Sequence, residues 1–201
     1  MQTLGLASEQ RRSDSRLKSI FWPSVANAWD VNYLGQQGFW ICWIIACIQF
    51  VLGLLTGNPL AVAISTFSAL VFLVGGMGVR EANWPAAAMV FALYMGNVLV
   101  AVCRGQFPSV FAVLGAAVLF SNVRAAYLAS EWKPAAEDGD RPTRFNETVA
   151  DKLVDQLPAK LWPRLQVVYF SLASALLLLE LLVLAVVLAR HLGLLAGVIP
   201  H

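Results

Sequence analysis

The chain has 201 residues, of which 59% are apolar and 13% are charged. Soluble domains contain about twice that share of charged residues and could not bury so much apolar surface at this length. The composition therefore predicts an integral membrane protein, and a formal net charge of +2 is too small to favour nucleic acid as a partner.

The N-terminal segment, residues 1–37, precedes the first apolar run. Within it, residues 16–34 combine apolar positions at helical spacing with neighbouring aromatic residues, namely Leu17, Phe21, Val25 and Ala28 beside Trp22, Trp29 and Tyr33. This pattern predicts an amphipathic helix that lies in the headgroup region of the membrane. An irregular leader with interfacial aromatic residues is the alternative.

Five apolar runs follow, at residues 38–55, 60–79, 84–103, 107–128 and 167–188. Each is close to the ~20 residues that an α-helix needs to cross the hydrocarbon core. Short links rich in Gly, Pro, Asn or charge separate the first four runs, so residues 38–128 are predicted to form antiparallel helical hairpins. Residues 167–201 are then a fifth span with a short apolar tail. The predicted fold is an all-α bundle of five transmembrane helices.

The connection between the fourth and fifth spans, residues 129–166, is long and basic. Its second half places apolar residues at a four-residue step, at Phe145, Val149, Leu153, Leu157 and Leu161. We expect a second amphipathic helix here, lying on the membrane or against the bundle. Pro158 and Pro163 are expected to limit it.

Lysine and arginine are distributed unevenly about the predicted spans. With the N-terminus in the cytoplasm, twelve of these residues lie on the cytoplasmic side and two lie outside. The positive-inside rule therefore predicts a cytoplasmic N-terminus, an external C-terminus and both amphipathic helices on the cytoplasmic side. The predicted location is a cell membrane, specifically the inner membrane of a cell that has two.

Glu180 is the sharpest candidate for a functional residue, because it lies in a leucine-rich stretch about 13 residues into the fifth span. A carboxylate at that depth is costly unless it is paired, hydrated or protonated. Gln49, Ser68 and Asn97 fall at a similar depth in other spans. The hypothesis is that these four residues form a proton- or cation-binding layer. The alternative is a hydrogen-bonded clamp between helices.

Three cations are candidates for contact with lipid or with a partner. Arg124 lies near the inner end of the fourth span, and Lys160 and Arg164 lie in the basic connection. Arg124 can extend to the cytoplasmic headgroups. It could otherwise pair with an acidic group or bind a lipid phosphate, and anionic headgroups suit all three residues.

Several chemistries lack their residues in this sequence. The two histidines are His191 and His201, both in the tail, so no histidine-based metal or haem site is predicted. The sequence contains no catalytic serine motif with a histidine partner and no phosphate-binding glycine loop. No catalytic residue, metal or cofactor is therefore assigned, and the sequence favours a protein that is not an enzyme.

Two functions remain in different classes. The first is a small ion- or proton-coupled transporter or channel subunit that uses Glu180. The second is a non-catalytic scaffold or accessory subunit of a larger membrane complex. Stripes of small residues permit close helix packing within the chain, and also with a second copy or a partner subunit. An enzyme that acts on lipid ranks third, because no catalytic constellation supports it.

Overall fold

The computed structural model describes residues 23, 25, 28–131 and 152–192, and all secondary structure in these residues is helical. The elements in chain order are α2 (Ala28–Leu55), α3 (Pro59–Arg80), α4 (Trp84–Cys103), α5 (Val110–Glu131), the short π-helix η2 (Lys152–Gln156) and α7 (Leu157–His191). Five of these helices are long and apolar enough to cross a membrane. The predicted all-helical class with five such helices is confirmed, whereas membrane insertion and interfacial helices stay predictions.

Local sequence signals fix the two tight hairpins. Asn58 caps α3, because its side-chain oxygen accepts the backbone N–H of Leu60 at 2.9 Å. Asn83 caps α4 in the same way, accepting the N–H of Ala86 at 3.0 Å. A proline lies in the first two positions of each helix, where its missing N–H has no cost. These signals explain why the hairpin boundaries could be predicted closely.

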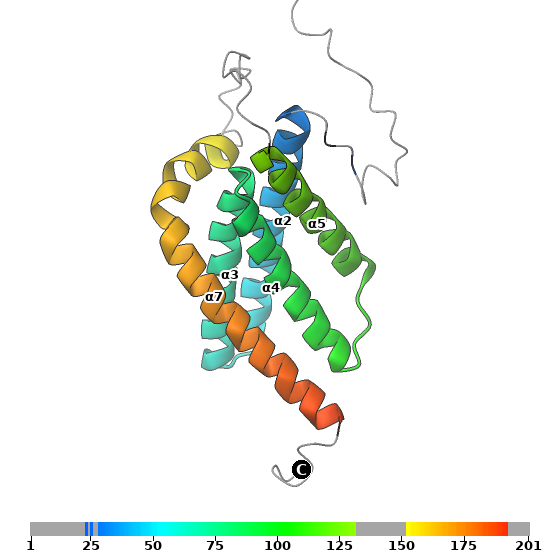
Figure 1. Ribbon diagram of the computed structural model, residues 1–201. Coiled ribbons are helices and arrows are strands. Elements are labelled where there is room, and N and C mark those ends of the chain that lie inside the picture. The colour runs from blue at the N-terminus through cyan, green and yellow to red at the C-terminus, as the bar shows by residue number, and fades with distance from the viewer. Residues whose placement is uncertain (1–22, 24, 26–27, 132–151, 193–201) are drawn as a thin grey trace, which may run out of the picture.

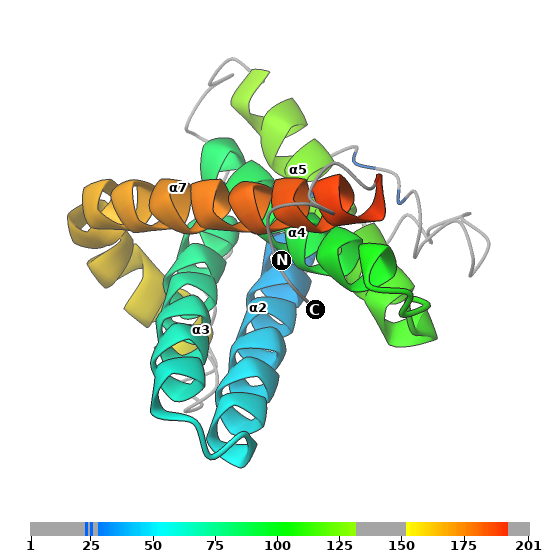
Figure 2. The same ribbon diagram turned by 90° about the horizontal axis from the view of Figure 1, so that it is seen from below.

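The helices form two hairpins and one crossing helix (Figure 1). Helix α2 packs along α3 and also contacts α5, while α4 packs against α3, α5 and α7. Helix α7 crosses α3 and α4 diagonally in both views (Figures 1 and 2). Segments that lie far apart in the sequence, α3 and the first half of α7, are therefore neighbours.

An ion-paired network joins three elements at one end of the bundle, which we call the clamped end. The Arg80 side chain, only 6% exposed, forms a salt bridge with Asp155 of η2, and its Nε donates to Asp155 Oδ1 at 3.0 Å. Its Nη1 donates to Asn32 Oδ1 of α2 at 2.7 Å. The opposite end, with the links at residues 56–58 and 104–109, we call the open end.

The buried apolar residues gather toward the clamped end. In the described helices the buried apolar side chains stop at Ala46 in α2, Leu93 in α4 and Leu176 in α7. In the two helices that run the other way, α3 and α5, they start at Ala69 and Leu119. The bundle is therefore tightly packed at one end, and its helices spread apart at the open end (Figure 2).

Two helices are longer than the sequence predicted. Helix α2 begins at Ala28 rather than Gly38. Residues 28–34, which the sequence assigned to a separate interfacial helix, belong to this continuous helix, and Val31 and Leu34 are buried against the bundle. Helix α7 runs without interruption through Pro163, so the expectation that this proline limits a separate helix is wrong. Its early turns bend relative to the rest (Figure 1), as proline in a helix commonly causes.

The expected second amphipathic helix is thus replaced by η2 and the start of α7. Leu153, Leu157 and Leu161 are partly buried and pack against the core, which agrees with the expected contact against the bundle. Phe145 and Val149 lie outside the described residues, as do the N-terminal helix before residue 28 (apart from residues 23 and 25) and the apolar tail beyond residue 192.

Candidate functional site

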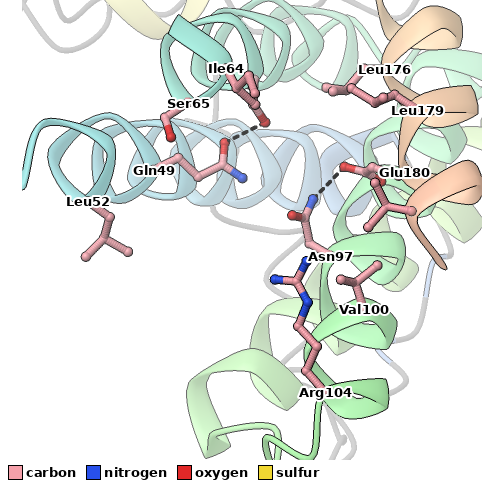
Figure 3. Close-up of a pocket in the computed structure, with 12 residues that line it drawn as sticks. Gln49, Leu52, Ile64, Ser65, Asn97, Val100, Arg104, Leu176, Leu179 and Glu180 are labelled. Carbon is pink, nitrogen blue, oxygen red and sulfur yellow. Dashed lines mark hydrogen bonds between the residues drawn. The ribbon is translucent and has the colours of Figure 1, made fainter. Parts of the chain in front are cut away.

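A cavity of about 390 Å³ lies among α2, α3, α4 and α7 in the open half of the bundle (Figure 3). Six of its twelve lining residues are apolar. The other six are polar or charged, namely Gln49, Ser65, Ser68, Asn97, Arg104 and Glu180. The structure therefore brings together all four residues of the predicted polar layer, although their role in binding stays a prediction.

Glu180 is joined directly to α4. Asn97 Nδ2 donates to Glu180 Oε1 at 2.7 Å, and the same nitrogen donates to the backbone oxygen of Leu93 at 3.0 Å. Because the amide is held by its own helix, it presents a fixed donor to the carboxyl group. The Asn97 oxygen remains on the cavity side as a further acceptor.

The second carboxyl oxygen of Glu180 lies against α4 at Gly96. A Cβ atom at position 96 would overlap Glu180 Oε2, and all of its nearest neighbours would be Glu180 atoms. Oε2 is buried and accepts no hydrogen bond from the described residues. Glycine at this position therefore allows the carboxyl group to fit between α4 and α7.

Gln49 and Ser68 form the opposite wall. Ser68 Oγ donates to Gln49 Oε1 at 2.9 Å, which ties α3 to α2. Ser68 is buried and Gln49 is half-buried. The amide nitrogen of Gln49 remains on the cavity side (Figure 3), so this wall offers the cavity both a donor and acceptor oxygens.

Arg104 is a lining residue that sequence reasoning did not select. It caps the C-terminal end of α4, and its side chain runs back along that helix toward Asn97 (Figure 3). The signal was present in the spacing, because residues seven apart lie on the same face of an α-helix. Arg104 was not selected because it lies in a short link just outside the predicted span.

The three candidate cations for lipid or partner contact lie away from the cavity, toward the clamped end. Arg124 Nη1 donates to the backbone oxygen of Pro23 at 2.7 Å, so part of its guanidinium group is used within the chain. Lys160 and Arg164 are exposed, one helical turn apart at the start of α7. Their contact with lipid or a partner stays a prediction.

The cavity lining carries several kinds of polar group. The cavity offers one carboxyl group, one guanidinium group, two amides and two hydroxyls. Its lining includes no histidine, cysteine or lysine. Within the described part of the chain, no cluster of three or more His, Cys, Asp or Glu is placed to hold a metal ion.

Comparison with known proteins adds no family to this description. The chain matches no model of a known protein family, and it is detectably similar to no curated protein and no solved structure. The fold and cavity thus define a helical chain with five potential membrane spans and a polar cavity at the open end.

Proposed function

We propose that this chain is an integral membrane protein that binds a proton or small cation at Glu180 as part of a transport cycle. The observation that supports this most directly is the Asn97–Glu180 hydrogen bond of 2.7 Å inside a cavity. A carboxyl group set among apolar helices, yet reachable from one end, can gain and lose a proton or cation.

Membrane insertion is supported by the outer surface of the bundle. Large apolar side chains are exposed along every long helix, and Leu178 and Leu182 of α7 are 68% and 62% exposed. Water would strongly disfavour so continuous an apolar surface, whereas lipid tails solvate it. Extraction of cell membranes with alkaline carbonate should leave the chain in the pellet, and release into the supernatant would contradict insertion.

The orientation follows from the basic residues. The positive-inside rule assigns the clamped end to the cytoplasm and the open end to the outside. The inner membrane of a cell that has two is the location that this orientation suits. In this placement the cavity lies in the outer half of the bundle and the packed core lies in the cytoplasmic half. That asymmetry is the one expected of a carrier in an outward-open state.

Replacing Glu180 tests the proposed function. The purified chain in liposomes should dissipate an imposed gradient of H⁺, Na⁺ or K⁺, followed with a trapped ion-sensitive dye. Glu180→Gln keeps the shape of the side chain and one acceptor oxygen but removes its charge and its acid proton, so the Glu180-dependent flux should be lost.

Glu131→Gln is the matched control, because Glu131 is exposed at the other end of the bundle. This variant should retain the flux of the unaltered chain. Equal flux from the Glu180→Gln variant, with intact folding, would reject a role for Glu180 in transport. Absence of flux from the unaltered chain would reject autonomous transport of these ions.

An accessory subunit is the second candidate function, and one observation favours it. Within the most apolar 18-residue stretch of α7, only 11% is buried within the described chain, the lowest share among the five potential spans. That exposed leucine surface suits a neighbouring membrane subunit or a second copy as well as lipid. Isolation of the chain in mild detergent with a stoichiometric partner would favour this function.

A further inference from the structure

Two opposite charges line the cavity without meeting. Glu180 and Arg104 are the charged residues among those that line it. The ion pair between Arg80 and Asp155 lies at the other end of the bundle. The Glu180 carboxyl group is bonded instead to Asn97, and Arg104 is exposed at the cavity mouth.

The separation of these charges can be bounded from α4. Arg104 follows Asn97, the residue that holds Glu180, by seven positions, which is about 10 Å along the helix and nearly the same face. The Arg104 side chain extends back toward Asn97 (Figure 3), so the guanidinium group is closer than its backbone. The gap between the two charged groups is therefore on the order of 10 Å or less.

The cavity has room for a ligand larger than a bare ion. Its volume of about 390 Å³ lies within the range of ~300–1,000 Å³ that is usual for small-molecule sites. Leu176, Leu179 and Val183 form an apolar wall beside the polar groups. A proton or bare cation at Glu180 would leave this wall and the Arg104 guanidinium group without a bound ligand group.

We propose that the cavity binds a small zwitterion, with its ammonium group at Glu180 and its anionic group at Arg104. The acceptor oxygen of Asn97 would take a further ammonium proton. The planar guanidinium group would bind a carboxylate or phosphate through two parallel hydrogen bonds. The apolar wall would contact the short carbon chain between the two charges. This inference rests on the proposed function, and names the class of its substrate.

Such a ligand could come from two sources that share this chemistry. A soluble amino acid would enter from the open end, whereas the headgroup of an aminophospholipid would enter from the membrane. Both carry a primary ammonium group joined by a short chain to an anion. Phosphatidylcholine is the control for the lipid source, because its quaternary ammonium group donates no hydrogen bond and should not bind at Glu180 as a primary ammonium group would.

The test uses the full purified chain. In detergent, calorimetric titration measures binding of 4-aminobutyrate, butylamine and butyrate. In lipid nanodiscs, the unfolding temperature is compared between phosphatidylethanolamine and phosphatidylcholine. We expect 4-aminobutyrate to bind roughly tenfold or more tightly than either half-ligand, because each half-ligand lacks one charged hydrogen bond.

Arg104→Gln and Glu180→Gln should each weaken the binding of 4-aminobutyrate by roughly tenfold or more. Arg104→Lys should lose less of the affinity for 4-aminobutyrate, because lysine keeps the positive charge. Arg190→Gln is the matched control, since Arg190 is exposed on α7 and is not part of the lining. Stabilisation only by phosphatidylethanolamine, lost in both Gln variants, would assign the same site to a lipid headgroup.

Two results would overturn the inference about the zwitterion without deciding whether the proposed function is correct. Butylamine binding as tightly as 4-aminobutyrate, with no effect of Arg104→Gln, would reject the zwitterion but retain a cation site at Glu180. No binding of the soluble probes and no difference between the two lipids would also reject it. The flux experiment with Glu180→Gln would then decide the proposed function by itself.

Discussion

Gly96 determines how closely α4 can approach the carboxyl group of Glu180. The nearest atoms to a Cβ added at this position would all belong to Glu180. The contact therefore couples two residues that lie on different helices, far apart in the sequence. Hydropathy alone identified Glu180, because an acidic residue among leucines is conspicuous, but it gave no reason to single out Gly96.

Gly96→Ala should destabilise the chain by up to about 1 kcal/mol, because the added methyl group displaces the end of the Glu180 side chain and weakens its hydrogen bond to Asn97. In the Glu180→Ala background the same substitution should be neutral or stabilising by up to ~1 kcal/mol, since alanine is the better helix former. Reversible unfolding in mixed detergent micelles measures both values. Equal costs in the two backgrounds would show that Gly96 and Glu180 are not coupled.

The cavity residues were predictable to different degrees. Gln49, Asn97 and Glu180 could be selected because polar side chains inside apolar runs are rare. Their depths placed them in one layer, and the structure brings them to one cavity. Arg104 was assigned to a solvated link, because composition does not indicate that a long side chain turns back along its own helix.

At the scale of the elements, η2 is joined to the bundle by the contact between its Asp155 and Arg80 of α3. Asp155 accepts hydrogen bonds from Arg80 on α3, and Arg80 also binds Asn32 on α2. Asp155 and Asn32 lie 75 and 48 positions from Arg80 in the sequence, respectively. No local pattern indicates such a pairing, which depends on the arrangement of whole helices.

Asp155→Asn should cost about 3 kcal/mol in unfolding free energy, because it leaves the buried Arg80 guanidinium group without its counter-charge. Replacing both residues, as Arg80→Met with Asp155→Leu, should recover part of that loss. Lys160→Gln provides the control, since Lys160 is exposed nearby. Thermal unfolding in detergent would contradict the assignment if Asp155→Asn behaved like Lys160→Gln.

The extent of the helices was predicted best where caps were present. The third span, residues 84–103, coincides with α4 because Asn83 and a following proline mark its start. The start of α2 was missed because residues 16–34 were assigned to a separate interfacial helix, whereas tertiary packing of Val31 and Leu34 makes residues 28–34 part of α2. The continuity of α7 was missed because a proline was assumed to end a helix that it only bends.

At the scale of the whole molecule, one end is packed and the other is spread apart. Hydropathy and short links predict five antiparallel spans, but they do not indicate how the spans lean on one another. That arrangement depends on close helix contacts at small residues. At Gly76, for example, an added Cβ atom would lie 2.9 Å from the Cys42 Cβ. Contacts of this kind draw α2 and α3 together toward the clamped end.

The predicted orientation can be tested with single cysteines in a chain that carries Cys47→Ala and Cys103→Ala. Gln106→Cys, in the exposed link at the open end, should react with a membrane-impermeant maleimide in intact cells. Lys160→Cys, at the clamped end, should react only after permeabilisation. The buried Cys42 provides the unreactive background. The reverse pattern would place the cavity on the cytoplasmic side.

The close fit of Gly96 to Glu180 has an evolutionary consequence. Drift at one of these positions is constrained by the residue at the other. Homologues that retain the glutamate should retain glycine opposite it, whereas those with a shorter residue at 180 should tolerate alanine or serine at 96. The two positions should therefore vary together among related sequences.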